Sequence, residues 1–207
     1  LARLLIVFGL FLTMLGSSAQ AQGNAGRPPF RYGVVVNSSA NYPEVAKLGF
    51  GYVKIYISWD NVEATPGTFT NYPDFAIQQA LSNNLQVVAL INNAPGWATS
   101  SGANLSESAP PSPAHVADFG TFMSNLATHY KGQIYAYEIW SVPNLTADWG
   151  GQNPDPDLFA QMLQSGGSAV HSADPNAVII SGGVANDGAG NPPQNLGDLA
   201  FIQELYQ

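Results

Sequence analysis

Tryptophan and amide side chains recur in three short runs of this sequence, and they are the residues best suited to chemistry. The runs are Trp59-Asp60-Asn61-Val62-Glu63, Asn92-Asn93-Ala94-Pro95-Gly96-Trp97 and Trp140-Ser141-Val142-Pro143-Asn144, with Trp149 shortly after the last. An indole offers a flat apolar face on which a sugar ring can stack, and amides hydrogen-bond hydroxyls as donors and as acceptors. The predicted binding residues are Trp59, Asn92, Asn93, Trp97, Trp140, Ser141, Asn144 and Trp149.

Each run lies at the end of a segment with the pattern of a β-strand. The strand candidates are 32–37, 52–59, 85–92, 134–140 and 177–184, several of them almost continuously apolar, as is typical of parallel strands buried on both faces. Amphipathic helices lie between them, and Ser112-Pro113 and Asp155-Pro156 each place a capping residue before a proline. About five β/α repeats predict an α/β fold with a parallel sheet. Periodicity does not choose between a doubly wound sheet and part of a barrel.

The position of the three runs favours one shared cleft. Ligands of parallel α/β folds bind at the carboxyl ends of the strands, where these runs fall. A phosphate site would need a glycine-rich turn between strand and helix. The first such turn, Asn37-Ser38-Ser39-Ala40-Asn41, has no glycine, which weakens a dinucleotide-binding interpretation.

The composition argues against several other ligand classes. The chain has 207 residues and a net charge of -8 at pH 7, which disfavours nucleic acid and anionic membranes as partners. Without cysteine it has neither disulfides nor thiolate metal ligands. His115, His129 and His171 fall on predicted helices without metal-ligand spacing. We therefore expect no metal and no cofactor.

The first 22 residues have the pattern of a signal peptide. Arg3 precedes an apolar run over 4–15, and Ala19-Gln20-Ala21 gives the small-x-small pattern that signal peptidase accepts. The apolar run falls short of the ~20 residues needed to span a bilayer. We expect 1–22 to be removed and 23–29 to be a linker. The mature protein is then secreted, extracellular or periplasmic, and not attached to a membrane.

The run Tyr137-Glu138-Ile139-Trp140-Ser141-Val142-Pro143-Asn144 resembles a family motif. The motif is the fourth-strand Trp-Asn-Glu-Pro-Asn of retaining (β/α)8-barrel glycoside hydrolases, the large clan that includes cellulases, β-mannanases and β-xylosidases. The stretch 53–69 is similar to that clan's second-strand region, and Ala94-Pro95-Gly96-Trp97-Ala98 to its third. The resemblance covers about 30–207 in order and spacing. It implies a TIM barrel, a polysaccharide or oligosaccharide substrate, and cleavage of O-glycosidic bonds by two carboxylates.

The sequence departs from the motif at the residues that carry this chemistry. The clan's Asn-Glu pair falls on Ser141 and Val142, and valine cannot transfer the proton that the glutamate transfers. The family's nucleophile belongs to strand seven, which would lie beyond Gln207. The chain is therefore predicted to be inactive, and no catalytic residue is assigned.

Two further acids are expected to be structural. Glu138 lies about 13 Å down the strand from Val142 at ~3.3 Å per residue, which is too deep to replace the missing acid. Because a buried charge usually needs a partner, we expect Glu138 to pair with Lys54 on the second strand. Glu63 is expected to stabilise its own loop.

The length predicts an incomplete barrel. A full TIM barrel needs about 250 residues and eight strands, whereas 30–207 contains about five β/α units. We interpret this region as the N-terminal part of a glycoside hydrolase barrel, the alternative being a five-stranded open sheet complete in itself. Two other functions stay open: a non-catalytic carbohydrate-binding pseudoenzyme and a periplasmic α/β ligand-binding domain.

Overall fold

The computed structural model describes residues 31–207 apart from 104, 106–107, 187, 189 and 207. Residues 31–207 form one compact unit. The predicted signal peptide at 1–22 and the linker at 23–29 lie outside the described residues.

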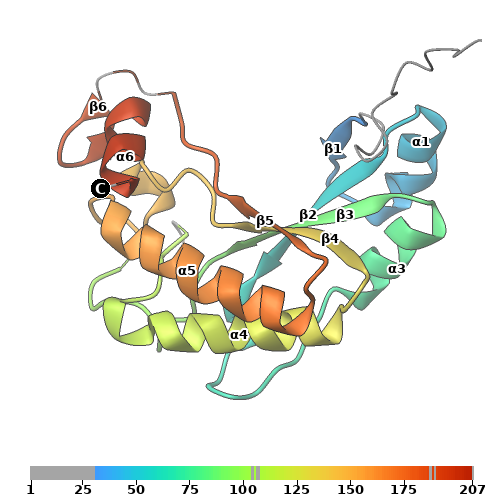
Figure 1. The fold of residues 1–207 in the computed structure, drawn as a ribbon, viewed down its shortest axis with the longest axis horizontal. Coiled ribbons are helices and arrows are strands. Elements are labelled where there is room, and N and C mark those ends of the chain that lie inside the picture. Colours follow the sequence, from blue (N-terminus) through green and yellow to red (C-terminus); the bar gives the residue numbers. More distant parts are fainter. Residues whose placement is uncertain (1–30, 104, 106–107, 187, 189, 207) are drawn as a thin grey trace, which may run out of the picture. The chain divides into compact units, whose positions relative to one another are not determined.

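A five-stranded parallel sheet forms the centre of this unit (Figure 1). Its strands are β1 (Gly33–Val35), β2 (Tyr52–Ser58), β3 (Gln86–Asn92), β4 (Ile134–Ile139) and β5 (Val178–Ser181). They are hydrogen-bonded in the order β1-β2-β3-β4-β5, so each strand pairs with the next along the chain. A doubly wound sheet reverses its strand order at a switch point, whereas consecutive order belongs to a β/α barrel. The α/β fold is confirmed, and the strand order is that of an incomplete TIM barrel.

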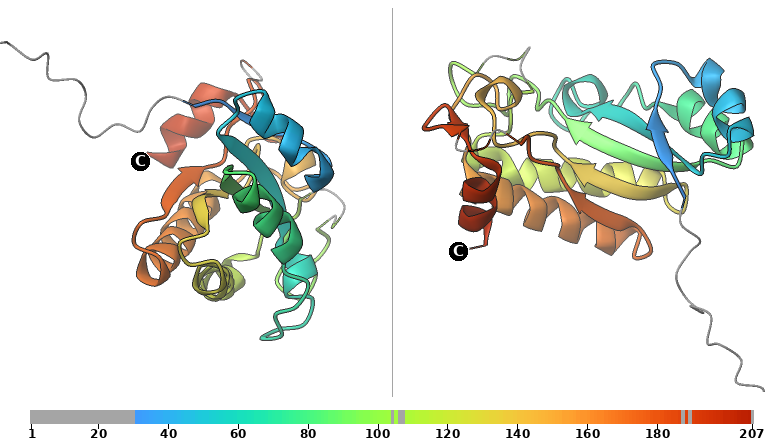
Figure 2. Two further views of the ribbon diagram at one scale, coloured as in Figure 1. Left: turned by 90° about the vertical axis from the view of Figure 1, so that its right-hand side faces the viewer. Right: turned by 90° about the horizontal axis from the view of Figure 1, so that it is seen from above.

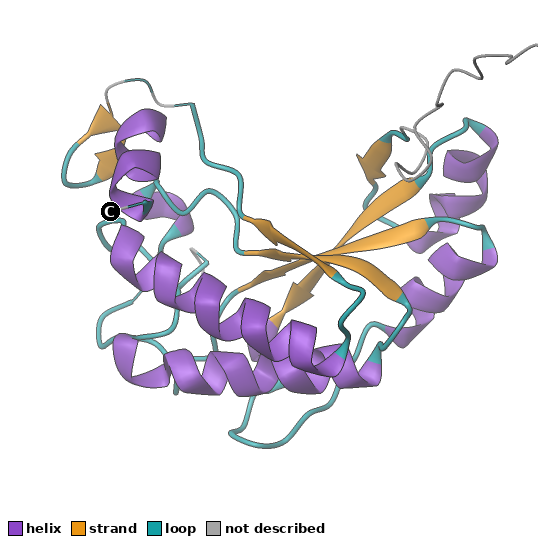
Figure 3. Cartoon of the chain, viewed as in Figure 1, coloured by secondary structure: helices purple, strands orange, loops and turns teal. Residues whose placement is uncertain are grey.

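Helices connect the strands. They are α1 (Tyr42–Lys47), α2 (Trp59–Val62), α3 (Asp74–Ser82), α4 (Val116–His129), α5 (Pro156–Ala173) and α6 (Asp198–Leu205), with 3-10 turns η1 (Ser39–Asn41), η2 (Pro113–His115) and η3 (Thr146–Asp148). A short antiparallel hairpin of β6 (Gly190–Asn191) and β7 (Asn195–Leu196) precedes α6. Helices α3, α4 and α5 lie on the same side of the sheet, with α4 and α5 side by side (Figures 2 and 3).

The two predicted helix starts have different outcomes. Asp155 accepts a hydrogen bond of 2.9 Å from the backbone N–H of Leu158, and Pro156 is the first residue of α5, as predicted. Ser112 makes no side-chain capping bond. The chain first forms the 3-10 turn η2 there, so the cap position of α4 passes to His115.

Side chains along β2 alternate between two faces of the sheet. Val53, Ile55 and Ile57 are buried on the face that the helices cover. Lys54 and Tyr56 lie on the opposite face, which we call the open face, and Tyr56 is 56% exposed there. Sugar-binding or catalytic side chains can reach solvent only from the open face or from the loops at the strand ends.

Burial on both faces was expected for several strands, and it holds only in the middle of the sheet. Leu90 of β3 and Ala136 of β4 are buried on the open face. In the outer strands, Val35, Val178 and Ile180 remain partly exposed. Within the described residues β1 pairs only with β2 and β5 only with β4, so no further strand covers these side chains.

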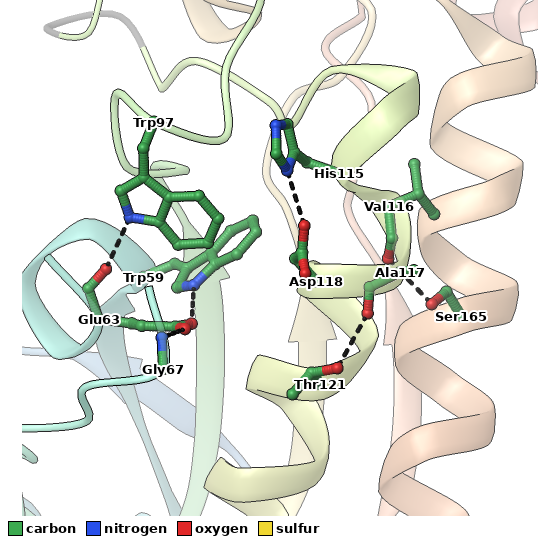
Figure 4. Close-up of polar contacts among 10 residues, drawn as sticks. All are labelled: Trp59, Glu63, Gly67, Trp97, His115, Val116, Ala117, Asp118, Thr121 and Ser165. Atoms are coloured by element: carbon green, nitrogen blue, oxygen red, sulfur yellow. Dashed lines mark hydrogen bonds and ion pairs between the residues drawn. The ribbon is translucent and has the colours of Figure 1, made fainter. Parts of the chain in front are cut away.

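Small residues let α4 and α5 approach each other closely. Gly166 of α5 lies against Phe119 of α4, where an added Cβ would lie 2.9 Å from the ring. The Ser165 hydroxyl donates a 3.1 Å hydrogen bond to the carbonyl of Val116 (Figure 4). This contact fixes the start of α4, which follows the loop that carries Trp97.

Candidate functional site

The carboxyl ends of β2, β3 and β4 bring the three predicted runs together. Ser58 and Asn92, the last residues of β2 and β3, are direct partners in the parallel register. Ile91 pairs with Ile139 at the end of β4, and the backbone N–H of Trp140 donates to the carbonyl of Ile91 at 2.9 Å. The candidate site is this edge of the sheet.

Trp59 is buried in the core instead of lining the site. Its ring is fully buried and stacks on Phe122 of α4, with 5.4 Å between ring centroids and 23° between ring planes. The residue continues the buried face of β2 that carries Ile55 and Ile57, which turns the indole toward the helices. The prediction that Trp59 stacks on a sugar is wrong in this structure.

Glu63 is almost fully buried and holds the loop after β2 (Figure 4). Its carboxylate accepts hydrogen bonds from Trp59 Nε1 at 2.7 Å and from the backbone N–H of Gly67 at 2.8 Å. Its backbone carbonyl accepts one from Trp97 Nε1 at 3.3 Å. The predicted role of Glu63 in stabilising its loop is confirmed, and the same bonds orient both indoles.

Trp97 is half-buried, and it is the one predicted tryptophan with an exposed part. Its ring meets Trp59 and His115 edge-on, each at 5.7 Å between centroids. His115 Nδ1 lies 2.7 Å from a carboxylate oxygen of Asp118 (Figure 4). Trp97 therefore has a fixed orientation at the rim of the candidate site.

Trp140 and Trp149 form a second buried pair. Both are essentially inaccessible, with 6.0 Å between their ring centroids, and Trp140 Nε1 donates to the carbonyl of Asp148 at 3.2 Å. Trp149 also packs edge-on against Phe159 of α5. The prediction that these two indoles line a sugar-binding cleft is wrong here, because their rings fill the space between the loop after β4 and α5.

Asn144 is a buried connector between loops. Its amide nitrogen donates to the carbonyls of Ala185 at 3.0 Å and Leu196 at 2.9 Å. Its side-chain oxygen accepts from the backbone N–H of Ala185 at 2.8 Å. Because both amide hydrogens are used within the protein, the predicted contact of Asn144 with substrate is wrong for this conformation.

Ser141 and Val142, onto which the resemblance placed an Asn-Glu pair, are half-buried. Val142 has φ of +49° and Trp140 has φ of +66°, a left-handed conformation that is rare for residues with a Cβ and rarest for β-branched ones. The N–H of Val142 donates to the carbonyl of Gly183 at 2.9 Å, which holds this turn against the end of β5. The turn is thus fixed, and the side chain it presents has no titratable group.

Four polar residues remain at the ends of β2 and β3. Asn92 and Asn93, which were predicted as binding residues, are half-buried. Ser58 and Asp60, which were not predicted as binding residues, are half-buried as well. The Ser58 hydroxyl donates to a carboxylate oxygen of Asp60. The alternation of side chains along β2 could have predicted the position of Ser58, because Ser58 lies on the open face with Lys54 and Tyr56.

The predicted ion pair between Lys54 and Glu138 is confirmed. Lys54 Nζ lies 2.5 Å from Glu138 Oε2, and the side chains are 31% and 10% exposed. Glu138 lies within β4 and pairs in register with Leu90 and Ile180, whereas Val142 lies in the turn after the strand, so the Glu138 carboxylate belongs to the open face.

No three histidine, aspartate or glutamate side chains in the described part of the chain gather so that they could hold a metal ion. No helix there combines the length and apolar character needed to cross a membrane.

The fold resembles part of the TIM barrel of solved glycoside hydrolases. Neither a protein-family model nor a curated protein matches the chain. A family 39 glycoside hydrolase from the gut symbiont Bacteroides cellulosilyticus WH2 has a TM-score of 0.57 and 16% identity, covering 72% of this chain and 30% of that chain. Endoglucanase Cel5A from the hyperthermophilic Thermotoga maritima has a TM-score of 0.53 and 18% identity, covering 82% and 48%.

A third similar structure comes from a complex with a sugar. It is a GH5 protein of Streptomyces cattleya with bound Manβ1-4GlcNAc, with a TM-score of 0.51 and 18% identity, covering 69% of this chain and 38% of that chain. Cel5A of Thermotoga maritima has also been solved with mannotriose as substrate. This chain spans less than half of each of these proteins. At these low identities the TM-scores establish a shared fold and nothing further.

Proposed function

We propose that this chain binds a saccharide at the carboxyl ends of β2, β3 and β4 and does not hydrolyse it. The observation that carries the proposal is Val142, which occupies the acid position of the fourth-strand motif. In the retaining mechanism a carboxylic acid at this point protonates the leaving oxygen and later activates water. A valine side chain can do neither.

No other residue of β4 replaces this acid. Glu138 is the carboxylate that β4 carries, and it lies within the strand, whereas position 142 lies in the turn that follows. It is held by Lys54 at 2.5 Å. A proton donor must lie within about 3.2 Å of the atom that it protonates, so Glu138 stays outside the reaction.

The residues that remain accessible support binding. Trp97 is the half-exposed aromatic residue at the rim, and Asn92, Asn93 and Ser141 are half-buried polar residues at the strand ends. Aromatic faces and amides are the groups that recognise sugar rings and hydroxyls. We also propose that the protein is exported by the 1–22 segment, which would place it where polysaccharides are found.

Binding and turnover are measured separately to test this function. Isothermal titration with mannotriose, cellotriose and xylotriose measures binding, and reducing-end assays on the same sugars measure hydrolysis, with Thermotoga maritima Cel5A as the positive control. We expect binding of at least one sugar and no hydrolysis. If reducing ends are released by an activity that co-purifies with this protein through two purification steps, the predicted inactivity is refuted. No binding by folded protein would refute the saccharide-binding role.

A matched variant tests the site. Trp97→Ala removes the accessible indole, and we expect affinity to fall about tenfold, which corresponds to a loss of about 1.4 kcal/mol in binding free energy. Phe75→Ala, which removes an exposed aromatic side chain from helix α3, outside the open face and the strand ends, is the control and should leave affinity unchanged.

A further inference from the structure

The ends of β2 and β3 place a hydroxyl and an amide side by side. Ser58 and Asn92 are register partners, and both are the final residues of their strands. Since partners in adjacent strands point to the same face, both side chains belong to the open face. Each is half-buried, so neither is sealed in the core.

The carboxylate of Asp60 is brought back to this pair. Its Oδ1 accepts the hydrogen bond of the Ser58 hydroxyl. Its backbone N–H donates to the carbonyl of Asn93 at 2.9 Å, which ties the start of α2 to the end of β3. Among the described residues no donor reaches the other carboxylate oxygen of Asp60, and no donor reaches the buried side-chain oxygen of Asn93.

The site therefore offers hydrogen-bond capacity that the protein does not use. A carboxylate accepts hydrogen bonds from two neighbouring hydroxyls, and charge-assisted bonds are about twice as strong as neutral ones. The Asn93 side-chain oxygen is buried without a donor, so it can accept a bond from a ligand hydroxyl only after the side chains that cover it shift. The Asn92 and Asn93 amides and the Ser58 hydroxyl lie beside the Asp60 carboxylate, and together these groups can hydrogen-bond several hydroxyls of a polyol.

We infer that Asp60, with Ser58 and Asn93 beside it, binds adjacent hydroxyls of a sugar ring and is a specificity-determining residue of this site. The inference rests on the proposed saccharide binding and adds the residue that selects among sugars. The backbone bond of Asp60 to Asn93 fixes the carboxylate relative to both strands. Sugars whose neighbouring hydroxyls differ in orientation then differ in affinity.

The test uses the 207-residue chain with mannotriose and cellotriose as probes, in buffer that contains EDTA. Asp60→Asn keeps the shape of the side chain and its bond from Ser58 but removes the charge. We expect mannotriose or cellotriose, whichever the unaltered protein binds more tightly, to bind at least tenfold more weakly to this variant. Asp157→Asn, which neutralises an exposed aspartate at the start of α5, is the matched control and should not change affinity.

Two further measurements separate recognition from folding. Thermal unfolding should be the same for Asp60→Asn and the unaltered chain, and the side-chain amide resonances of Asn93 should shift when the sugar is added. If Asp60→Asn does not fold, Ser58→Ala tests the inference instead, because it keeps the Asp60 charge and removes the Ser58 hydrogen bond that orients the carboxylate. We expect threefold weaker binding or more, and unchanged affinity would overturn the inference.

The outcomes distinguish the two proposals. If the unaltered chain binds sugar and Asp60→Asn binds equally well, the role of Asp60 is wrong while saccharide binding stands. If the unaltered chain binds neither probe nor xylotriose, saccharide binding fails and the role of Asp60 fails with it. Binding that appears only when Ca²⁺ replaces EDTA would also overturn the inference, because the carboxylate would then serve as a cation ligand.

Discussion

Lys54 Nζ lies 2.5 Å from Glu138 Oε2, which joins β2 to β4 across β3 on the open face of the sheet. Glu138 is nearly buried, whereas Lys54 keeps about a third of its side chain exposed. A carboxylate in this position needs a nearby positive charge, because burial without one is strongly unfavourable. The pair therefore fixes both partners in place, and it removes Glu138 from any role in proton transfer.

Removing one partner of this pair should destabilise the fold. Lys54→Met leaves the Glu138 carboxylate without its cation, and we expect a loss of about 2 kcal/mol in the free energy of unfolding, less than for a fully buried pair because Lys54 is partly exposed. Lys54→Met with Glu138→Leu should recover most of this loss. Urea unfolding of both single variants and the double variant measures the coupling, and additive losses would show that the pair does not act as a unit.

Asp74 should make stability depend on pH at the acidic end. Its pKa lies below the usual 3.8, chiefly because His129 Nε2 hydrogen-bonds Oδ1 at 2.8 Å, with a second bond from the Tyr130 hydroxyl. The folded state thus holds the proton less tightly than the unfolded state, so this stabilisation is present above pH 3.8 and is lost as the pH falls through the lower folded value.

The Asp74→Asn variant isolates this contribution. Its stability should fall less steeply between pH 5 and pH 3 than that of the unaltered chain, whereas Asp157→Asn should follow the unaltered chain. Thermal unfolding at intervals of half a pH unit gives the slopes. Parallel curves for Asp74→Asn and the unaltered chain would contradict the assignment.

The left-handed backbone at Val142 should be strained. With φ of +49°, valine is in a conformation that costs L-residues about 1–2 kcal/mol. Val142→Gly should therefore raise the free energy of unfolding by about 1 kcal/mol, although glycine elsewhere usually lowers it. Val184→Gly, in a loop residue packed against the core, is the contrasting control and should destabilise. A loss of stability in Val142→Gly would mean that the valine side chain contributes more by packing than the backbone costs.

The buried bond between Trp59 and Glu63 should matter for folding and not directly for sugar contact. Trp59→Phe removes the donor to the Glu63 carboxylate and leaves a buried acceptor unpaired, which should cost about 2–3 kcal/mol. Affinity for mannotriose, measured on the folded fraction, should be unchanged. A large loss of affinity with normal stability would show that Trp59 contacts the ligand, in conflict with its buried position.

Much of the fold could be predicted from the sequence because it depends on local patterns. Apolar runs of strand length gave the five strands, and Asp155-Pro156 marked the start of α5. The pairing of Lys54 with Glu138 followed from the cost of an isolated buried charge. The absence of an acid at position 142 is likewise a property of the sequence, which no arrangement of the chain can alter.

The direction of each candidate side chain was decided only by the tertiary structure. Trp59 lies on the same face as Ile57 and points toward the helices. Only the packing of α4 against that face shows that it is the core face. Trp140 follows the last residue of β4 with φ of +66°, so strand alternation no longer sets its direction. The side-chain amide of Asn144 donates its hydrogen bonds to backbone carbonyls 41 and 52 residues further along the chain.

The site that remains depends on pairing between strands that are distant in sequence. Ser58 and Asn92 meet because β2 and β3 take one register, and Asp60 joins them because its backbone bonds to Asn93. The sequence determined which chemical groups are available at the strand ends and that position 142 carries no acid. The tertiary structure decided which groups face solvent, because burial and hydrogen bonding are set by the packing of segments that only the folded chain brings together.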